Sequence, residues 1–342
     1  MGMNEVATEY ALLKKADGKI IYGEGPFTEL ESCPSNGVAF YVNDFALKDE
    51  KPWKVPSSWR EVDRLDFSSS SGSGIEVAWE ELNPSEFAKV FSEINHAIGK
   101  GEIEKSVPVA AEQGKVISGE VSDLLGALTT GDDVGGDSFF PYAWVTGDRG
   151  FCGLTPEVLF NVRKGRLNTM ALAGTAKAEE QEVFAFDEKE IREHEFVAQT
   201  LVSKLSDIGM VTKSERSILD LGALVHFHTP IEVFLYGDKN IEDLIKRLHP
   251  TPALGPLPRT QQTMDDLIRW REMLDCPAYF GAPFGVFEDG VFHAVVTIRG
   301  VHWSGEDICV PSGCGVIEAS RLVNEWRELG LKRGAVKRSF KI

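Results

Sequence analysis

The sequence predicts an α+β fold in which large, mainly antiparallel sheets pack together with helices on the outside. Short apolar segments are joined by tight turns such as Asp17-Gly18, Lys164-Gly165 and Asp289-Gly290, and such turns are typical of β-hairpins. Groups of strands alternate with single helices, an order that favours antiparallel sheets over a doubly wound parallel sheet. Glycine-rich nucleotide-binding motifs and nucleophile-elbow motifs are absent from the sequence, so neither a dinucleotide-binding fold nor a triad hydrolase is supported.

The first hundred residues are predicted to be rich in strands. Residues 9–22 form two strands around Asp17-Gly18, and residues 37–42 form a third. Residues 48–74 are mostly polar and end in SSSSGSG, which predicts a loop. A helix then begins at Asn83-Pro84 and ends at Gly99, because Asn caps helices and Pro favours their first position.

The rest of the chain is predicted to alternate strands with helices. We expect strands at 101–109, 139–145, 158–162, 167–172, 218–227, 279–287 and 291–303, and helices at 121–128, 187–209, 241–248, 263–274 and 320–332. Residues 152–157 are expected to form a turn. Four prolines make residues 249–259 a rigid segment that cannot be helical.

Composition and charge exclude several classes of protein. The net charge of −17 argues against nucleic-acid binding, which depends on Lys and Arg. No window approaches the ~20 apolar residues of a membrane span, and the first residues, MGMNEVATEY, lack the pattern of a secretory signal. The five cysteines are scattered without a C-x-x-C pair. We therefore expect a cytoplasmic protein that binds neither membranes nor nucleic acid.

Two predicted helices each carry a Glu-x-x-Glu pair at one end of an apolar stripe. These are Glu190 with Glu193 and Glu325 with Glu328, and residues three apart share a helix face. For either pair alone, a solvated face is the better interpretation. If the four carboxylates converged, however, they would repel one another unless a cation lay between them. Hard oxygen ligands without cysteine favour Mg²⁺.

Single polar residues also interrupt apolar segments. Lys105 shares a strand face with apolar neighbours, so it is either an edge-strand lysine that prevents aggregation or a partly buried amine that acts as a base. Arg299 lies within the apolar segment AVVTIRG and should face an anion, because an unpaired buried arginine is costly. On local sequence alone, Glu157 is better interpreted as a turn residue and His226 as a hydrogen-bonded core residue.

Several motifs together resemble the chorismate-utilising enzymes, which include anthranilate synthase large subunits and the aminodeoxychorismate, salicylate and isochorismate synthases. The motifs are HPTPALGPLPR (249–259), Tyr279 with Thr297-Ile298-Arg299, Gly313-Cys314-Gly315-Val316 and NEWRELGLK (324–332), supported by KEIREH (189–194), ALAGT (171–175) and TPE (155–157). The resemblance covers residues 101–342, the implied chorismate-binding catalytic part. Residues 1–100 match poorly and would be a strand-rich part of the same fold. The resemblance implies the fold of anthranilate synthase large subunits, with one structural domain overall.

The resemblance also implies a Mg²⁺-dependent site. Lys105 matches the general base of the family, and Glu157 matches the acid that faces it across the substrate ring. The acidic residues that match the family's metal site are Glu190, Glu193, Glu325 and Glu328, with Glu193 and Glu328 as direct ligands. The residues that match substrate-binding positions are Thr175, His226, Ala253, Tyr279, Arg299, Gly313, Gly315 and Lys332.

Within the family, the residues favour an isochorismate synthase, which converts chorismate by adding water at C2 and removing the C4 hydroxyl. Ala173 stands where aminodeoxychorismate synthase has a nucleophilic lysine, and Ala253 stands where anthranilate and salicylate synthases usually carry threonine. Because water is the nucleophile, we expect a monomer that needs no glutaminase subunit. The resemblance leaves open whether the product enters menaquinone or siderophore biosynthesis.

Two stretches depart from the family pattern. KSVPVA (105–110) replaces the usual KVVLAR, and GTAKAEE (174–180) replaces the usual GTRPRG. They motivate a competing hypothesis, a homologue that binds chorismate without catalysis. A salicylate or anthranilate synthase-like enzyme is the other alternative.

Overall fold

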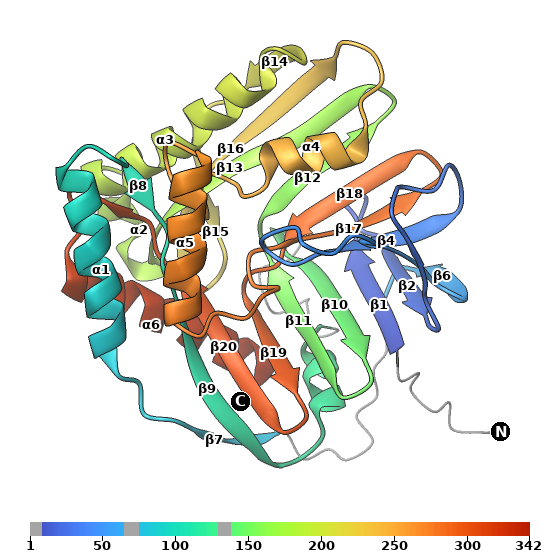
Figure 1. Cartoon of the computed structure of the whole chain (residues 1–342), viewed down its shortest axis with the longest axis horizontal. Helices are drawn as coiled ribbons and strands as arrows, with labels where there is room; N and C mark the ends of the chain where they lie inside the picture. The colour runs from blue at the N-terminus through green and yellow to red at the C-terminus, as the bar shows by residue number, and fades with distance from the viewer. Residues whose placement is uncertain (1–8, 65–74, 129–137) are drawn as a thin grey trace.

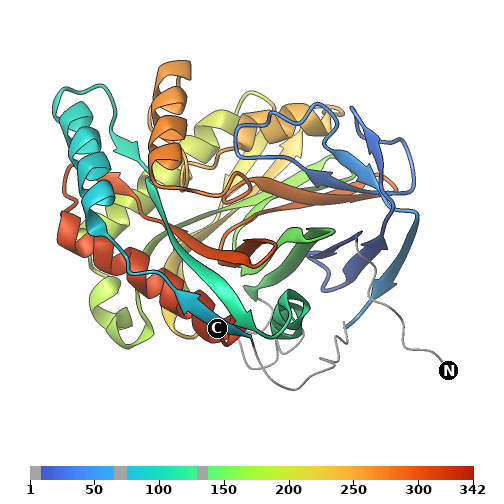
Figure 2. The same ribbon diagram turned by 60° about the horizontal axis from the view of Figure 1, so that its bottom comes forward.

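Two large antiparallel sheets form the centre of the molecule (Figures 1 and 2). The structure is a computed structural model that describes residues 9–64, 75–128 and 138–342. Within these residues the first sheet has nine strands in the order β6-β2-β1-β10-β11-β19-β20-β9-β7. Their bounds are Ser58–Val62, Ile20–Glu24, Glu9–Lys14, Phe140–Thr146, Arg149–Thr155, Gly300–Ser304, Asp307–Gly313, Val109–Ser118 and Glu76–Trp79, in the same order.

The second sheet has ten strands in the described residues, in the order β14-β16-β13-β12-β18-β17-β4-β5-β3, with β15 also paired to β16. Their bounds are Gly209–Lys213, Leu224–Leu235, Arg166–Lys177, Val158–Arg163, Val291–Val296, Pro283–Glu288, Val38–Val42, Trp53–Val55, Thr28–Leu30 and, for β15, Ser217–Asp220. A small third sheet pairs β8 (Lys105–Ser106) with β21 (Val316–Ile317). Strands from residues 9–64 belong to both large sheets.

The two large sheets pack face to face because their strands are apolar on both sides. On β1, Leu13 faces the second sheet, whereas Leu12 faces the opposite side. On β4, Phe40 faces the first sheet and Tyr41 faces away from it. Strand residues buried on both faces need a covering layer on each side, and helices supply the outer layers.

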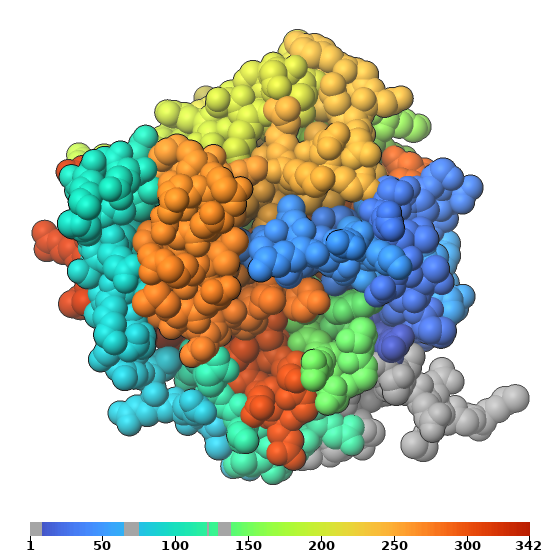
Figure 3. Space-filling model, viewed as in Figure 1, coloured from blue at the N-terminus to red at the C-terminus, as the bar shows by residue number. Residues whose placement is uncertain are grey.

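The helices cover the two outer faces of the sheets. Their bounds are α1 Pro84–Gly99, α2 Gln181–Phe184, α3 Glu188–Leu205, α4 Ile241–Leu248, α5 Gln261–Met273 and α6 Leu322–Phe340, with short 3-10 helices η1 Val121–Leu128 and η3 Ala178–Glu180. Helices α3 and α4 pack on the second sheet, and the end of α6 packs with η1 on the first. Helices α1 and α5 lie side by side on one face of the molecule (Figure 3). None of the described helices has the length and apolarity that crossing a membrane requires.

The predicted α+β class with large antiparallel sheets is confirmed, and so are the predicted helices. The Asn83 side chain accepts a hydrogen bond from the Ser85 amide at the start of α1. In the same way, Asp187 caps α3. These helix starts are readable from sequence because a cap depends only on neighbouring residues.

Six expectations about strands and their connections are wrong. Residues 218–227 form two strands, because β15 ends at Asp220 and β16 begins at Leu224. The strand expected from Tyr279 begins only at Pro283, as β17. Residues 101–109 do not form one strand, because β8 ends at Ser106 and β9 begins only at Val109. Residues 152–155 belong to β11 and are not a turn. Residues 291–303 divide into β18 and β19, which belong to different sheets. The predicted loop at 48–74 contains β5 and β6, and its residues 65–74 lie outside the described part.

Two of these differences mark places where the chain crosses from one large sheet to the other. Pro156-Glu157 joins β11 to β12, and residues 297–299 join β18 to β19. The two crossings are hydrogen-bonded to each other: the Leu154 amide donates to the Arg299 carbonyl (3.1 Å), and the Val296 amide donates to the Glu157 carbonyl (3.0 Å). Arg299 takes a left-handed backbone conformation (φ 57°). The crossings therefore place Glu157 and Arg299 at one point of the fold.

Candidate active site

A pocket of about 670 Å³, partly open to solvent, lies where the two sheets exchange strands. Nine residues predicted from the sequence line it, namely Glu157, Thr175, Glu193, His226, Ala253, Arg299, Gly313, Gly315 and Lys332. They come from strands of both large sheets, from helices α3 and α6, and from the connections between them. The fold thus brings together residues that are up to 175 positions apart in the chain.

Lys105 is fully buried and lies behind the lining of the pocket, next to Glu193. Its Nζ donates to the Pro252 carbonyl at 3.0 Å and forms an ion pair with Glu193 Oε1 at 3.3 Å. Its backbone exchanges hydrogen bonds with Leu257. A lysine that protects a sheet edge must be exposed to solvent, so that alternative is excluded.

Glu157 is almost completely buried, with 3% of its surface exposed. Burial raises the pKa of its carboxyl to about 7, although the Thr251 hydrogen bond and the charges of Lys105 and Lys332 lower it. Thr251 Oγ1 donates to Glu157 Oε1 at 2.8 Å. A carboxyl group with a pKa near neutrality can give up or accept a proton at physiological pH. The interpretation of Glu157 as a plain turn residue is therefore wrong.

Arg299 is held in the pocket by His226. The Gly174 carbonyl can only accept, so Nδ1 of His226 donates to it (2.7 Å), and Nε2 accepts from the Arg299 guanidinium (2.8 Å). Burial, together with the charges of Arg299 and Lys332, holds the pKa of His226 well below its usual value. Burial also lowers the pKa of Arg299 to about 10, so the guanidinium stays charged at neutral pH.

The charge of Arg299 has no carboxylate partner within ion-pair distance in the described part of the chain. A buried cation without a partner is unfavourable unless an anion binds it. The pocket is thus prepared for a negatively charged ligand.

A second corner of the pocket consists of backbone and one lysine. Lys332 Nζ donates to the Gly313 carbonyl (2.9 Å) and to Glu328 Oε1 (2.6 Å). Gly315 lies directly against Glu193, and a Cβ atom at this position would collide with the Glu193 carboxylate. Only glycine allows this close approach.

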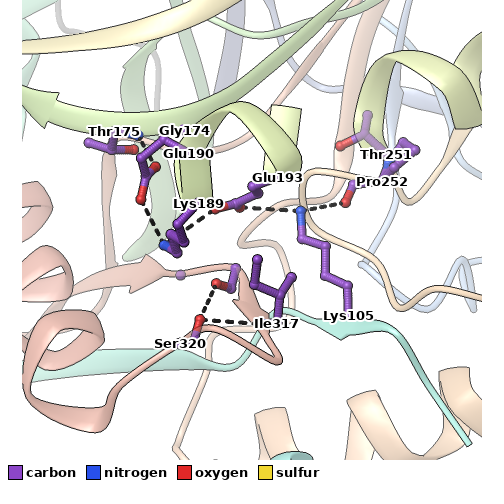
Figure 4. A network of polar contacts seen from close by, with 12 residues as sticks. Lys105, Gly174, Thr175, Lys189, Glu190, Glu193, Thr251, Pro252, Ile317 and Ser320 are labelled. Carbon is purple, nitrogen blue, oxygen red and sulfur yellow. Dashed lines mark hydrogen bonds and ion pairs between the residues drawn. The ribbon is translucent and has the colours of Figure 1, made fainter. Parts of the chain in front are cut away.

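The four predicted metal ligands do converge, from the start of α3 and the start of α6. Three of them lie around an ammonium group that was not predicted from the sequence, that of Lys189, and Figure 4 shows Lys189 with Glu190 and Glu193. Lys189 Nζ lies 2.8 Å from Glu190 Oε1, 3.4 Å from Glu325 Oε1 and 3.6 Å from Glu193 Oε2. Glu328 is paired with Lys332 but also acts on Lys189 through space.

Burial and the neighbouring charges shift the pKa values of three of these carboxyls. Burial and the neighbouring Glu193 raise the pKa of Glu190 to about 7, and burial likewise raises the pKa of Glu325 to about 7. Burial opposes ionisation of Glu193 too, but Lys105, Lys189 and Lys332 outweigh it and hold the pKa of Glu193 below its usual value. Of this acidic set, Glu193 is therefore firmly ionised.

The acidic cluster fits a hard divalent cation by its donors. All four donors are carboxylates, which Mg²⁺ prefers, and Oε2 of Glu325 is buried without a hydrogen bond of ordinary geometry. Within the described residues, no three acidic, His or Cys side chains are close enough together to hold an ion, and the Lys189 ammonium lies beside three of the four carboxylates. The residues therefore suit a hard divalent cation by the chemistry of their donors.

Tyr279 is the one predicted substrate-binding residue that the structure does not bring to the pocket. Its ring packs against Phe151 with ring centroids 5.2 Å apart, and it lines a separate groove beside Trp144 and His302. The next residue, Phe280, lines the pocket instead. Residues 278–281 form turns and β17 begins only at Pro283, so the two neighbouring side chains lie on different sides of the backbone.

Two polar residues of the site were not singled out in the sequence. Thr251 binds the Glu157 carboxyl, and Lys189 neutralises the acidic cluster. Both lie inside motifs that were recognised, HPTPALGPLPR and KEIREH. Their roles depend on contacts across the fold, to residues in other segments of the chain, so only the motifs themselves could have pointed to them.

Comparison with known proteins agrees with this site. A family model described as chorismate binding enzyme matches residues 40–340. The chain is 28% identical to the isochorismate synthase MenF of Bacillus subtilis over 323 residues, which cover 91% of the chain and 62% of that relative. It is 30% identical to the isochorismate synthase EntC of Escherichia coli over 190 residues, which cover 53% of the chain and 48% of that relative.

The chain spans less than two thirds of the length of these two relatives. Among solved structures, MenF, the menaquinone-specific isochorismate synthase from Escherichia coli, superposes with a TM-score of 0.81 at 16% identity, over 98% of the chain and 89% of that structure. This likeness shows a shared fold. Because the family model matches most of the chain, the resemblance seen in the motifs is confirmed, and the protein belongs to the family of chorismate-binding enzymes.

Proposed function

We propose that this protein is an isochorismate synthase, an isomerase that converts chorismate to isochorismate. The observation that carries the proposal is a pocket lined by a buried carboxyl with a pKa of about 7 and by an arginine without a carboxylate partner in the described chain, with a fully buried lysine directly behind its lining. Relatives named isochorismate synthase support it. An acid and a base held close to one pocket can carry out two proton transfers near neutral pH.

The reaction exchanges one hydroxyl group for another. Lys105 acts in its neutral amine form: its lone pair takes a proton from water, whose oxygen forms a bond to C2 of the ring, and Lys105 becomes an ammonium. The ring double bonds shift, and the C4–O bond breaks as Glu157 delivers a proton to the leaving hydroxyl, which departs as water. Thr251 holds the Glu157 carboxyl in place, and the Pro252 carbonyl holds the Lys105 ammonium.

The remaining residues orient a dianionic substrate. Arg299, aligned by His226, would bind one carboxylate. The corner formed by Gly313, Gly315 and Lys332 would bind the other negative group. Two anchored carboxylates fix the ring between the acid and the base, and such positioning contributes strongly to the rate.

The cofactor is proposed to be Mg²⁺, held by Glu193 and Glu328 with Glu190 and Glu325 close by. When bound, the ion would neutralise the ring carboxylate of the substrate. The protein contributes the carboxylates and keeps Glu193 ionised through its neighbouring lysines. We further propose that the protein is a cytoplasmic monomer. It needs no glutaminase partner, because the nucleophile is water.

Ala253 is proposed to determine the product. It lines the pocket next to Leu254, where a threonine would add both a hydroxyl group and bulk. Without that contact the enolpyruvyl group is not positioned for loss of pyruvate, so the reaction stops at isochorismate. Replacing Ala253 by Thr should reduce hydration and introduce pyruvate-releasing side reactions.

The experiment is an assay of products. Purified protein incubated with chorismate and Mg²⁺ should yield isochorismate, separated by chromatography, in a reversible reaction. Lys105→Ala and Glu157→Ala should each lower the rate by roughly 10²–10⁴, the range for positioned proton transfer. Salicylate as the main product, or anthranilate from chorismate and ammonium, would overturn the assignment. Tight chorismate binding without turnover would instead favour a non-catalytic homologue.

A further inference from the structure

The acidic cluster of Glu190, Glu193, Glu325 and Glu328 already contains a cation that belongs to the chain. Lys189 reaches from the first turn of α3 towards α6, and its Nζ is within 3.6 Å of three of the four carboxylates. Although burial alone would lower the pKa of Lys189, the four carboxylates raise it well above its usual value. The ammonium is therefore charged and acts as the counter-ion of the cluster.

We propose that Lys189 is a displaceable internal cation, which occupies the cluster in the metal-free protein and leaves it when a divalent metal ion binds. The inference rests on the metal site of the proposed function. Lys189 and the metal ion would compete for that site. It makes metal binding an exchange of cations, in which one ammonium is replaced by one divalent ion.

Geometry puts the two occupants in competition. The oxygens nearest to Lys189 are Glu190 Oε1, Glu325 Oε1 and Glu193 Oε2, and Glu193 is one of the two proposed metal ligands. Mg²⁺ binds oxygen at about 2.0–2.1 Å. Because Lys189 Nζ lies 3.6 Å from Glu193 Oε2, an ion bound to that oxygen would lie at most about 5.7 Å from the ammonium, and two like charges so close in a buried cluster repel each other.

The surrounding structure gives the lysine a place to go. Lys189 lines a polar groove next to the pocket, and 21% of its side chain is exposed there. Glu180 and Asp187 line the same groove and offer carboxylates to a displaced ammonium. Lysine has a flexible stem, so the movement needs only a rotation of the side chain.

The exchange also has a consequence for metal selectivity. A monovalent ion carries the same charge as the ammonium, so it gains little electrostatic energy by replacing it. A divalent ion interacts twice as strongly with each carboxylate. In the metal-free protein, Lys189 thus disfavours the binding of monovalent ions to the cluster.

The first test measures Mg²⁺ binding by isothermal titration calorimetry in the wild type, in Lys189→Met and in Lys177→Met. Methionine keeps the length of the side chain and removes the charge. Lys177 lines the same groove but pairs only with Glu179 at 3.2 Å among the described residues, so it is the matched control. We expect Lys189→Met to bind Mg²⁺ about tenfold more tightly, within the range typical of coupling between two ligands. Lys177→Met should match the wild type.

The outcomes of the titration distinguish failure of the cation exchange from failure of the metal site. Equal or weaker Mg²⁺ binding by Lys189→Met would overturn the exchange while leaving the metal site intact. No Mg²⁺ binding in any of the three proteins would overturn the metal site of the proposed function, and the exchange with it. Binding by Lys189→Met but not by the wild type would be the strongest support for competition.

A second test uses the unaltered protein, so it does not depend on the folding of a variant. Acetic anhydride labels exposed amines, and peptide mass spectrometry reports the labelled fraction of each lysine. We expect Lys189 to be poorly labelled without metal and several-fold more labelled with saturating Mg²⁺, whereas labelling of Lys177 should stay constant. Lower or unchanged labelling of Lys189 on addition of Mg²⁺ would contradict its displacement.

Discussion

At the scale of single residues, the proposed acid and base are positioned by one short segment. Thr251 binds the Glu157 carboxyl and the adjacent Pro252 carbonyl binds the Lys105 ammonium. Prolines restrict this segment to few conformations, and the Leu257 backbone anchors Lys105 a second time. The motif HPTPAL therefore holds both proposed catalytic groups, and its Ala253 and Leu254 also line the pocket.

Glu157 should make the stability of the protein depend on pH. Its pKa is about 7 in the folded protein and 4.5 for the ordinary group, so the folded state favours the protonated form. The contribution of Glu157 to the free energy of unfolding is therefore fully present below about pH 4.5 and is lost as pH rises through 7. Because one pKa unit corresponds to about 1.4 kcal/mol, this contribution is about 3 kcal/mol.

The measurement compares urea unfolding of the wild type and Glu157→Gln between pH 5 and pH 8, without metal. Glutamine resembles the protonated carboxyl, so the variant should lose less stability over this range. Glu190 and Glu325 contribute a similar dependence to both proteins, and it cancels in the difference. Glu86→Gln, on the exposed surface of α1, is the control. Parallel curves for wild type and Glu157→Gln would show that Glu157 is ionised throughout.

Single residues also mark the limit of prediction from sequence. Arg299 was expected to face an anion, because an arginine inside an apolar segment is costly to bury unless a negative charge binds it; the structure places it in the pocket without a carboxylate partner in the described residues, and the anion itself stays a prediction. Local sequence favoured a turn for Glu157, and only the family motif suggested its role. The burial that shifts its pKa comes from segments about a hundred residues away, and local sequence does not contain that information.

At the scale of elements, helices were easier to predict than strands. The starts of α1 and α3 follow from caps that lie next to them in sequence. In contrast, apolar residues continue from β18 into β19 although the chain changes sheets between them. Both strands are buried, so hydrophobicity alone cannot show the crossing. The crossing itself carries Arg299, and the part of the fold that was hardest to predict is the part that forms the site.

Strand β13 contains an irregularity that serves the site. Its pairing with β16 shifts register between Ala173 and Ala176, and Gly174 there has a φ of 76°. This bulge turns the Gly174 carbonyl towards His226 and the Thr175 amide towards Glu190. β-Bulges near active sites commonly redirect individual groups in this way.

Replacing Gly174 by Ala should therefore damage both stability and activity. A left-handed conformation costs a non-glycine residue about 1–2 kcal/mol, and the new Cβ would lie 3.1 Å from Phe227 and 3.3 Å from the Glu190 carbonyl. Gly165 is the matched control, since its φ is 74° but no atom of the described residues lies within 4 Å of an added Cβ. Gly165→Ala should lose about 1 kcal/mol in urea unfolding and keep its activity. Full activity in Gly174→Ala would show that the bulge does not position the site.

At the scale of the whole molecule, acidic charge is concentrated where a cation is needed. The chain carries a net charge of −17. Four of its carboxylates form the acidic cluster between α3 and α6, and two of these, Glu190 and Glu325, have pKa values raised to about 7. A folded state that crowds like charges is destabilised until counter-charges bind. Metal binding should therefore appear as added stability of the entire fold.

Mg²⁺ should raise the melting temperature of the wild type at pH 8, and Glu325→Gln should largely abolish the increase. An ion that binds only the folded state stabilises it by about 2.7 kcal/mol at one hundred times its dissociation constant. Glu325 is 1% exposed and its Oε2 lacks a hydrogen bond of ordinary geometry, so removing its charge should also raise the melting temperature of the metal-free protein. Glu318→Gln, at an exposed position just before α6, should behave as the wild type in both respects. If Mg²⁺ raised the melting temperature of Glu325→Gln as much as that of the wild type, the ion would bind outside the acidic cluster. If metal-free Glu325→Gln melted at a lower temperature than the metal-free wild type, the Glu325 charge would stabilise the fold through Lys189.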